Sequence, residues 1–233
     1  MSLGALLVVQ RVLALVAAVL IIVGLKRLSS PATARAGNAL AAWGLALAVA
    51  ATFVAGVPHH LGLILFGLAL GSGLGFWGAR VVKMTDMPQM VALLNGLGGG
   101  AAAAVSVAEF VALSGVPGPL FHVTSILAGT LIGGLSFSGS LVAFAKLQGL
   151  VGERPARIPG GRGLQAALVA VALVAAWIAG ASGSMPAFIA FVLLSLALGV
   201  LMVVPIGGAD MPVVISILNS CTGLAAAAAG FVL

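Results

Sequence analysis

The chain has 233 residues, of which 62% are hydrophobic and 6% are charged, and its formal net charge is +6. Because soluble domains carry about 25% charged residues, this composition excludes an ordinary soluble domain and indicates an integral membrane protein. The ten Lys and Arg residues lie in short loops rather than on one basic face with aromatic residues, which argues against a nucleic-acid-binding protein. The single cysteine, Cys221, cannot form an internal disulfide.

Apolar runs that match the roughly 20 residues needed to cross a bilayer follow one another along the whole chain. We predict an all-α transmembrane bundle of about eight helices, at 3–25, 37–56, 59–80, 87–112, 119–145, 164–182, 185–206 and 209–232. Residues 1–233 then form one membrane domain, in which a loop at 147–163 joins two halves, 1–146 and 164–233. Lys26 and Arg27 follow the first run directly, as expected of a retained helix rather than a cleaved signal peptide.

Basic residues occur in alternate connections only. These connections hold Lys26, Arg27 and Arg35, then Arg80 and Lys83, then Lys146, Arg154, Arg157 and Arg162. The connections at 56–60, 114–119 and 180–185 hold no Lys or Arg. The positive-inside rule therefore places the basic loops in the cytoplasm and the N-terminus outside. We expect the membrane to be a bacterial inner membrane, in which case the N-terminus is periplasmic.

One stretch occurs twice, as DMPQMVALLNGLGGGAAAA at 86–104 and DMPVVISILNSCTGLAAAA at 210–228. Each copy begins with an aspartate and a proline in the positions typical of a helix start, so we expect Asp86 and Asp210 to cap helices at the cytoplasmic surface. An alternative is that these acids contact a part that changes state. Because both helices enter from the same side, the repeat is predicted to be parallel.

Asn95 and Asn219 are the equivalent amides of the two copies, nine residues after the aspartates. At 1.5 Å per residue each lies about 13 Å into a hydrocarbon core about 30 Å thick. Such an amide either forms a hydrogen bond between helices or lines a hydrated path. Because asparagine does not titrate, a proton path through it requires water and a protonatable partner.

Three serines, Ser136, Ser138 and Ser140, lie close together in the predicted fifth helix. Each hydroxyl can donate to the carbonyl four residues earlier, which is the ordinary behaviour of a helical serine. The alternative is that a serine orients water in a pore. The glycines that surround them indicate close helix packing.

Few ionisable residues fall inside the predicted helices. Arg11 either reaches the outer surface with its long side chain or pairs with an acid of a partner subunit. His59, His60 and His122 are expected near the outer surface, solvated or exchanging protons, and Glu109 is expected to be a solvated acid at a helix end. The sequence shows no metal-ligand cluster, and its glycine runs lack the strand context of a nucleotide-binding fold.

Three segments resemble the beta subunit of the proton-translocating NAD(P) transhydrogenase: MTDMPQMVALLNGLGG at 84–99, FSGSLVAFAKLQG at 137–149 and IGGADMPVVISILNS at 206–220. The resemblance implies the membrane domain of an enzyme that moves a proton across the membrane while hydride passes between NAD(H) and NADP(H) on soluble domains. The chain itself then has no hydride-transfer site and binds no cofactor or metal. The implied partners are a soluble NADP(H)-binding domain, the alpha subunit or subunits, and membrane lipid, in a homodimer of such assemblies.

Individual residues can be matched to the motifs of this family. Asn219 resembles its intramembrane asparagine in the proton path, Ser140 its serine after glycine, and Asp210 its acid at the face that meets the NADP(H) domain. Asp86 is the repeat equivalent of Asp210 at the cytoplasmic mouth. Asn95 stands where some members have a histidine, so we expect a membrane helix of the alpha subunit to supply the titrating imidazole.

An even number of helices places Leu233 outside, on the side opposite the basic loops. A cytoplasmic NADP(H)-binding domain cannot follow directly from that side. We therefore expect a ninth helix and the nucleotide domain to be absent from this chain.

Two other functional classes fit the sequence pattern. A secondary transporter with a parallel repeat needs no nucleotide partner, and its substrate site would show unwound helices near the midplane. An inert anchor for soluble subunits is disfavoured, because burying paired amides in the membrane has a cost that anchoring does not require.

Overall fold

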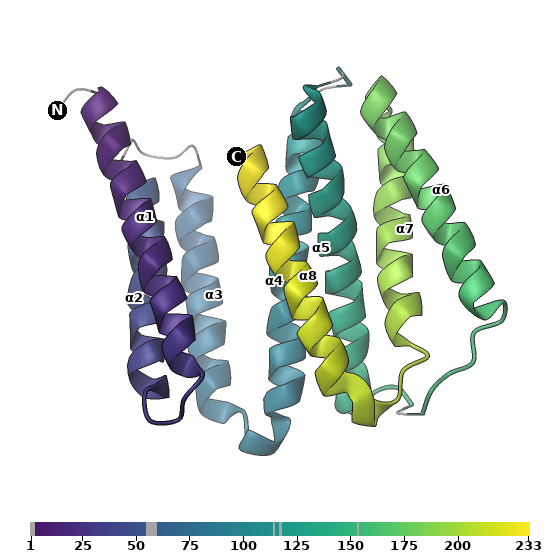
Figure 1. Cartoon of the computed structure of the whole chain (residues 1–233), viewed down its shortest axis with the longest axis horizontal. Helices are drawn as coiled ribbons and strands as arrows, with labels where there is room; N and C mark the ends of the chain where they lie inside the picture. Colours follow the sequence, from purple (N-terminus) through teal and green to yellow (C-terminus); the bar gives the residue numbers. More distant parts are fainter. Residues whose placement is uncertain (1–2, 55–59, 114, 117, 153) are drawn as a thin grey trace. The chain divides into compact units, whose positions relative to one another are not determined.

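The computed structural model describes residues 3–54, 60–113, 115–116, 118–152 and 154–233. These residues form eight α-helices and two short 3-10 turns, without a strand. All eight helices are long and apolar enough to cross a membrane, so the predicted all-α membrane bundle is confirmed. In chain order they are α1 (Leu3–Leu28), α2 (Ala34–Thr52), α3 (Leu61–Val81), η1 (Met84–Asp86), α4 (Met87–Ala112), α5 (Leu120–Leu147), α6 (Gly161–Ser182), α7 (Met185–Val203), η2 (Gly208–Asp210) and α8 (Met211–Val232) (Figure 1).

The helices group into two compact units, Met1–Arg80 and Val81–Leu233. The loop that was predicted to join two halves, 147–163, lies inside the second unit, between α5 and α6. The predicted start of the third helix, at residue 59, falls outside the described residues. In the second unit, α4 and α8 both begin at the end where α5 finishes, so the two copies of the repeat run in the same direction (Figure 1). We call this the basic end, because Lys146, Arg157 and Arg162 lie near it.

In the first unit, α1 and α2 pack through small residues. A side-chain carbon added at Gly24 would lie 2.7 Å from the backbone nitrogen of Ala41 and 2.8 Å from the carbonyl oxygen of Gly37. The helices approach this closely only because glycine has no side chain. On α3, by contrast, Gly67 and Gly71 have open space around them.

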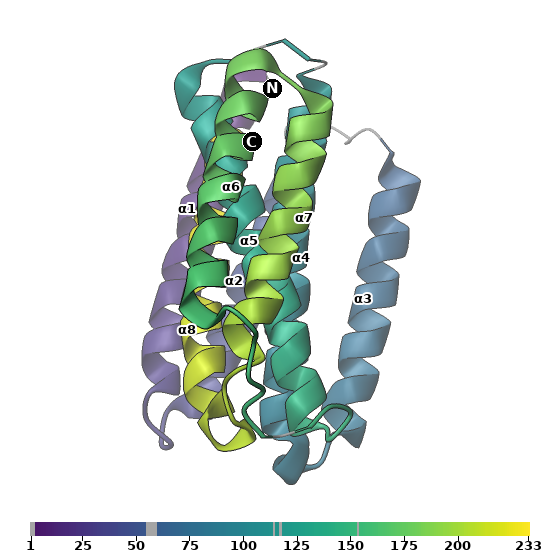
Figure 2. The ribbon, with the colours of Figure 1, turned by 90° about the vertical axis from the view of Figure 1, so that its right-hand side faces the viewer.

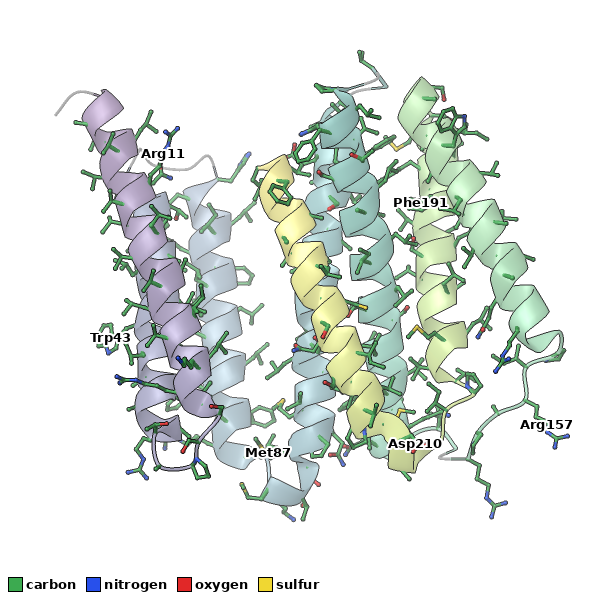
Figure 3. The ribbon with its side chains drawn as sticks, in the orientation of Figure 1. Arg11, Trp43, Met87, Arg157, Phe191 and Asp210 are labelled. Atoms are coloured by element: carbon green, nitrogen blue, oxygen red, sulfur yellow. The ribbon has the colours of Figure 1, made fainter. Side chains whose placement is uncertain are left out.

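The centre of the second unit is α5, which packs against α4, α7 and α8, while α6 lies along α7 (Figure 2). Aromatic rings fill the region where these helices meet. Phe110 of α4 stacks on Phe188 of α7 with ring centroids 3.8 Å apart, and Phe191 is also fully buried (Figure 3). Van der Waals packing of this kind holds membrane helices together, since lipid provides no hydrophobic driving force between them.

Glycines bring α4 and α5 into close contact. A side-chain carbon at Gly133 of α5 would lie 2.7 Å from the carbonyl oxygen of Gly99 and 2.9 Å from the backbone nitrogen of Ala103. No larger residue fits there without displacing the backbone. The polar side chains of α4 and α5 are therefore held against each other.

Asp86 and Asp210 directly precede α4 and α8, but neither carboxylate forms the predicted capping hydrogen bond to the described backbone. Each residue closes a 3-10 turn, with φ of −100° and ψ of 7° at Asp86 and φ of −91° and ψ of −1° at Asp210. A capping residue normally has an extended backbone, from which its side chain reaches the first free N–H groups. The prediction of side-chain capping was therefore wrong, although the position at the helix start was right.

Candidate functional site

A buried amide joins α4 to α5. Asn95 of α4 is only 7% exposed, and its Nδ2 donates to Ser140 Oγ at 2.8 Å and, over a longer 3.5 Å, to Ser136 Oγ. Both serines are fully buried on α5. Because lipid offers polar groups no hydrogen bonds, this amide is satisfied by protein instead.

The hydrogen bonds continue from α5 to α8. Ser136 Oγ donates to the carbonyl oxygen of Leu218 at 2.9 Å and lies 2.5 Å from Thr222 Oγ1. Either hydroxyl can be the donor in the second contact, because the Ser136 proton can point to Leu218 or to Thr222. Asn95, Ser136, Ser140 and Thr222 thus form one connected group, which we call the amide–hydroxyl cluster.

Glycines of α4 make room for each member of the cluster. A side-chain carbon at Gly96 would lie 3.2 Å from Ser140 Cβ, one at Gly99 would lie 3.1 Å from Ser136 Cβ, and one at Gly98 would lie 3.3 Å from Thr222 Cγ2. The run of small residues after Asn95 therefore does more than allow general packing. It sets α5 and α8 at hydrogen-bonding distance from the amide.

One atom of the cluster has an unused capacity for hydrogen bonding. Asn95 Oδ1 is buried and has no hydrogen-bond partner among the described residues. Leaving such an acceptor unsatisfied costs about 1–3 kcal/mol. Buried polar atoms of this kind usually bind water or a donor, so Oδ1 is suited to hold one.

Asn219 does not join the cluster, although it is the repeat equivalent of Asn95. Its side chain is exposed on α8 in the described chain, whereas the preceding residue, Leu218, is buried and contributes its carbonyl oxygen. Ser216 and Ser220 share the exposed side of the helix with Asn219. The two copies of the repeat therefore place their amides in different environments.

The serines of α5 behave in two ways. Ser138 donates within its helix to Gly134, at 3.1 Å, and also across to the carbonyl oxygen of Leu196 on α7. Ser136 and Ser140 bind other helices instead. The sequence analysis did not single out Thr222, although its spacing of four residues from Leu218 places both on one face of α8.

At the basic end, α5 is fixed to the connection between α7 and α8. Lys146 is 2% exposed, and its Nζ donates to the carbonyl oxygens of Val204 and Ile206, both at 2.6 Å. Ile206 lies four residues before Asp210, which is exposed at the start of α8 (Figure 3). Composition had suggested an ordinary loop cation here, so this structural role of Lys146 was missed.

The remaining candidates are not members of the amide–hydroxyl cluster. Asp86 is half-buried and accepts from Thr85 Oγ1 at 3.2 Å. Arg11 is exposed on α1 (Figure 3). Glu109 and His122 approach to 4.0 Å, and His59 lies outside the described residues.

Comparison with known proteins now identifies the family. A family model described as the NAD(P) transhydrogenase beta subunit matches residues 10–233. The chain belongs to this family. Two curated relatives named "NAD(P) transhydrogenase subunit beta", both from Rhodospirillum rubrum and one of them from a named strain, are each 39% identical to the chain over 227 residues. Those matches cover 94% of the chain but 48% of each relative, so the chain spans about half the length of the curated relatives.

The family assignment confirms the resemblance that the three motifs suggested. The three motifs lie on three helices of the second unit. Segment 84–99 forms η1 and the first half of α4, segment 137–149 includes the end of α5, and segment 206–220 forms η2 and the start of α8. These are the three helices that supply the amide–hydroxyl cluster.

Proposed function

We propose that this chain is the proton-conducting membrane domain of a transhydrogenase. Proton movement through it is coupled to hydride transfer between NAD(H) and NADP(H), which bind to soluble domains outside this chain. The observation that carries the proposal is the buried group of Asn95, Ser140, Ser136 and Thr222, with the unpartnered Oδ1 of Asn95 at its centre. Placing polar groups inside a membrane costs free energy, and such groups commonly mark the paths of ions or protons.

Each cluster residue has a role in this proposal. Asn95 Oδ1 accepts a hydrogen bond from water or from a protonated imidazole, while Ser140 fixes the orientation of the amide through Nδ2. Neither residue titrates, so a histidine on a membrane helix of the alpha subunit carries the proton. Asn219 faces outward on α8, where a helix from a partner is able to reach it.

Coupling to the soluble domains takes place at the basic end. Asp210 is exposed and Asp86 is half-buried, so both carboxylates can contact a domain that covers this end. The two nucleotide states of that domain favour different states of the membrane site, which opens alternately to the two sides. Thermodynamic linkage makes the effect reciprocal, so the proton gradient in turn drives hydride transfer.

The assembly follows from the same assignment. The chain works with one or more alpha subunits and an NADP(H)-binding domain, as a homodimer of such assemblies in a bacterial inner membrane, with its basic loops in the cytoplasm. It binds neither cofactor nor metal itself, and it binds no nucleic acid. The exposed apolar side chains of α1 and α3 contact lipid or partner helices.

A secondary transporter with a parallel repeat is the second candidate. Transporters of that type have helices that are unwound at the substrate site. The continuous course of α4, α5 and α8 through the cluster favours proton conduction over this alternative.

Reconstituted vesicles distinguish these functions. Proton flux is measured in vesicles that contain the complete transhydrogenase and in vesicles that lack its soluble domains. Flux that requires both nucleotides and soluble domains supports our proposal. Substrate-driven flux without soluble domains indicates a transporter, and no flux under either condition indicates an anchor.

A further inference from the structure

We propose that Glu109 and His122 form the proton-exchange site at the end of the second unit opposite the basic end. The inference rests on the proposed function, because it adds an outlet to the path through the amide–hydroxyl cluster. Glu109 lies in the last turn of α4 and His122 in the first turn of α5. Both therefore sit on the same pair of helices as Asn95 and Ser140.

The geometry suits an exchange of protons with water. Glu109 Oε2 lies 4.0 Å from His122 Nε2, and the side chains of His122 and Glu109 are 27% and 32% exposed. Both groups thus reach water, and they are close enough to attract each other as an ion pair although they form no direct hydrogen bond. Histidine is the side chain whose charge normally changes between about pH 5 and pH 8. The pair supplies the titratable groups that the amide–hydroxyl cluster lacks.

No other ionisable side chain competes at this end of the second unit. In the sequence, α7 and α8 contain no Asp, Glu, Lys, Arg or His, and the only one in α6 is Arg162 at the basic end. Lys146 and the two aspartates also lie at the basic end. The connections at 113–119 and 183–184 contain none. Apart from the free thiol of Cys221, which precedes Thr222 on α8, a proton that leaves the cluster in this direction meets its first titratable group at Glu109 and His122.

Buried hydroxyls lie between the cluster and the pair. Ser106 of α4 is fully buried and packs against Gly129 of α5. Its Oγ donates to the carbonyl oxygen of Ala102 at 3.2 Å. Thr130 is 1% exposed, and its Oγ1 has no hydrogen-bond partner among the described residues. An unpaired buried hydroxyl is a common sign of a bound water. Thr130 also lines a groove of about 500 Å³ between α4, α5 and α7, where it is the one hydroxyl among otherwise apolar lining residues.

The spacing along α5 places Thr130 between the two ends of the path. It lies six residues from Ser136 and eight from His122, or about 9 Å and 12 Å along the helix. A short chain of waters bridges each of these gaps. Three buried side-chain atoms lack a partner among the described residues, and one of them, Gln89 Oε1, lies at the start of α4 toward the basic end. The other two, Asn95 Oδ1 and Thr130 Oγ1, lie on facing helices and are the fixed hydrogen-bonding atoms for that water.

The test uses the complete transhydrogenase in vesicles, with the pH varied only on the side that faces His122. The variants are His122→Asn, Glu109→Gln and Thr130→Val. Controls are His60→Asn, which changes an exposed histidine of the first unit, and Thr124→Val, which removes an exposed hydroxyl of α5. Thr130→Ser keeps the hydroxyl and serves as the conservative variant.

We expect His122→Asn to slow proton translocation about tenfold and to flatten its pH profile. This is less than the loss of about 100-fold or more for a removed acid–base group, because Glu109 remains. The double variant His122→Asn with Glu109→Gln should translocate protons more slowly than either single variant. Thr130→Val should translocate protons more slowly than wild type. Thr130→Ser and both controls should translocate protons at the wild-type rate.

A wild-type rate and pH profile in His122→Asn and Glu109→Gln, with translocation abolished by Asn95→Leu, would overturn this inference and leave the proposed function standing. If Asn95→Leu also translocates protons normally, both proposals fail.

Discussion

The Nδ2 atom of Asn95 lies 2.8 Å from the Oγ atom of Ser140, a residue 45 positions later in the chain. Glycine next to Asn95 allows this contact, since a side chain at Gly96 would press on Ser140 Cβ at 3.2 Å. The contact fixes the relative rotation of α4 and α5 and joins them to α8 through Ser136.

Removing the Ser140 hydroxyl should weaken both stability and function. Ser140→Ala leaves the buried Nδ2 of Asn95 with only its 3.5 Å contact to Ser136, which should lower the free energy of unfolding by about 1–2 kcal/mol. Proton translocation should fall as well, because the amide is no longer held in one orientation. Ser220→Ala is the control, since Ser220 is exposed and bonds only within α8. Equal melting temperatures of the two purified variants would contradict the assignment.

The close contact of α4 and α5 should not tolerate an added methyl group at Gly133. Gly133→Ala places a carbon 2.7 Å from the Gly99 carbonyl oxygen, and overpacking of this kind destabilises by about 1–3 kcal/mol. Gly67→Ala on α3 adds the same group in open space and should leave the melting temperature unchanged or raise it slightly. Thermal unfolding of both variants in detergent tests this difference. A Gly133→Ala protein as stable as wild type would show that the helices are farther apart.

Lys146 should hold the connection that leads to Asp210. Lys146→Met leaves the carbonyl oxygens of Val204 and Ile206 without their donor, at a cost of about 2–4 kcal/mol. Hydrogen exchange should accelerate at the backbone amides of 204–210, and coupling to the soluble domains should weaken. Lys83→Met is the matched control, because Lys83 is exposed. Unchanged exchange in the Lys146 variant would show that the connection is held by other contacts.

Asn219 should matter for conduction but little for stability. Because its side chain is exposed in the described chain, Asn219→Leu should change the free energy of unfolding by less than about 0.5 kcal/mol. Proton translocation by the complete enzyme should nevertheless fall, since the proposed path includes this amide. Ser216→Ala, on the same side of α8, is the control. Full translocation in Asn219→Leu would remove this residue from the path.

Much of the architecture could be predicted from the sequence because hydrophobic length is decisive in a membrane protein. The start of α4 at Met87 was predicted correctly, and α8 begins at Met211, two residues after the predicted start at 209, each within an Asp-Met-Pro sequence. The ends of the fifth and seventh helices differ by two or three residues from those predicted. The prediction of side-chain capping was wrong because Asp86 and Asp210 close 3-10 turns. These turns give the aspartates a backbone conformation that cannot be read from residue type alone.

The candidate site was predicted only in part. Asn95 and Ser140 were each predicted as candidate residues of the proton path, but their contact was not predicted. That contact depends on how α4 and α5 are rotated about their axes, and a single sequence does not specify this rotation. The same reason explains why Asn219, in an equivalent sequence, is exposed rather than buried. Lys146 follows a long apolar run, so its burial against two carbonyl groups depends on the fold of a connection 58 to 60 residues away.

The most direct test of proton conduction is the number of protons translocated per hydride transferred by the complete enzyme carrying Asn95→Leu. Leucine is similar in size to asparagine but can neither bind water nor donate to Ser140. The account predicts that translocation is nearly abolished while the protein still assembles in the membrane with its soluble domains. A wild-type rate with an unchanged ratio of protons to hydride would contradict it.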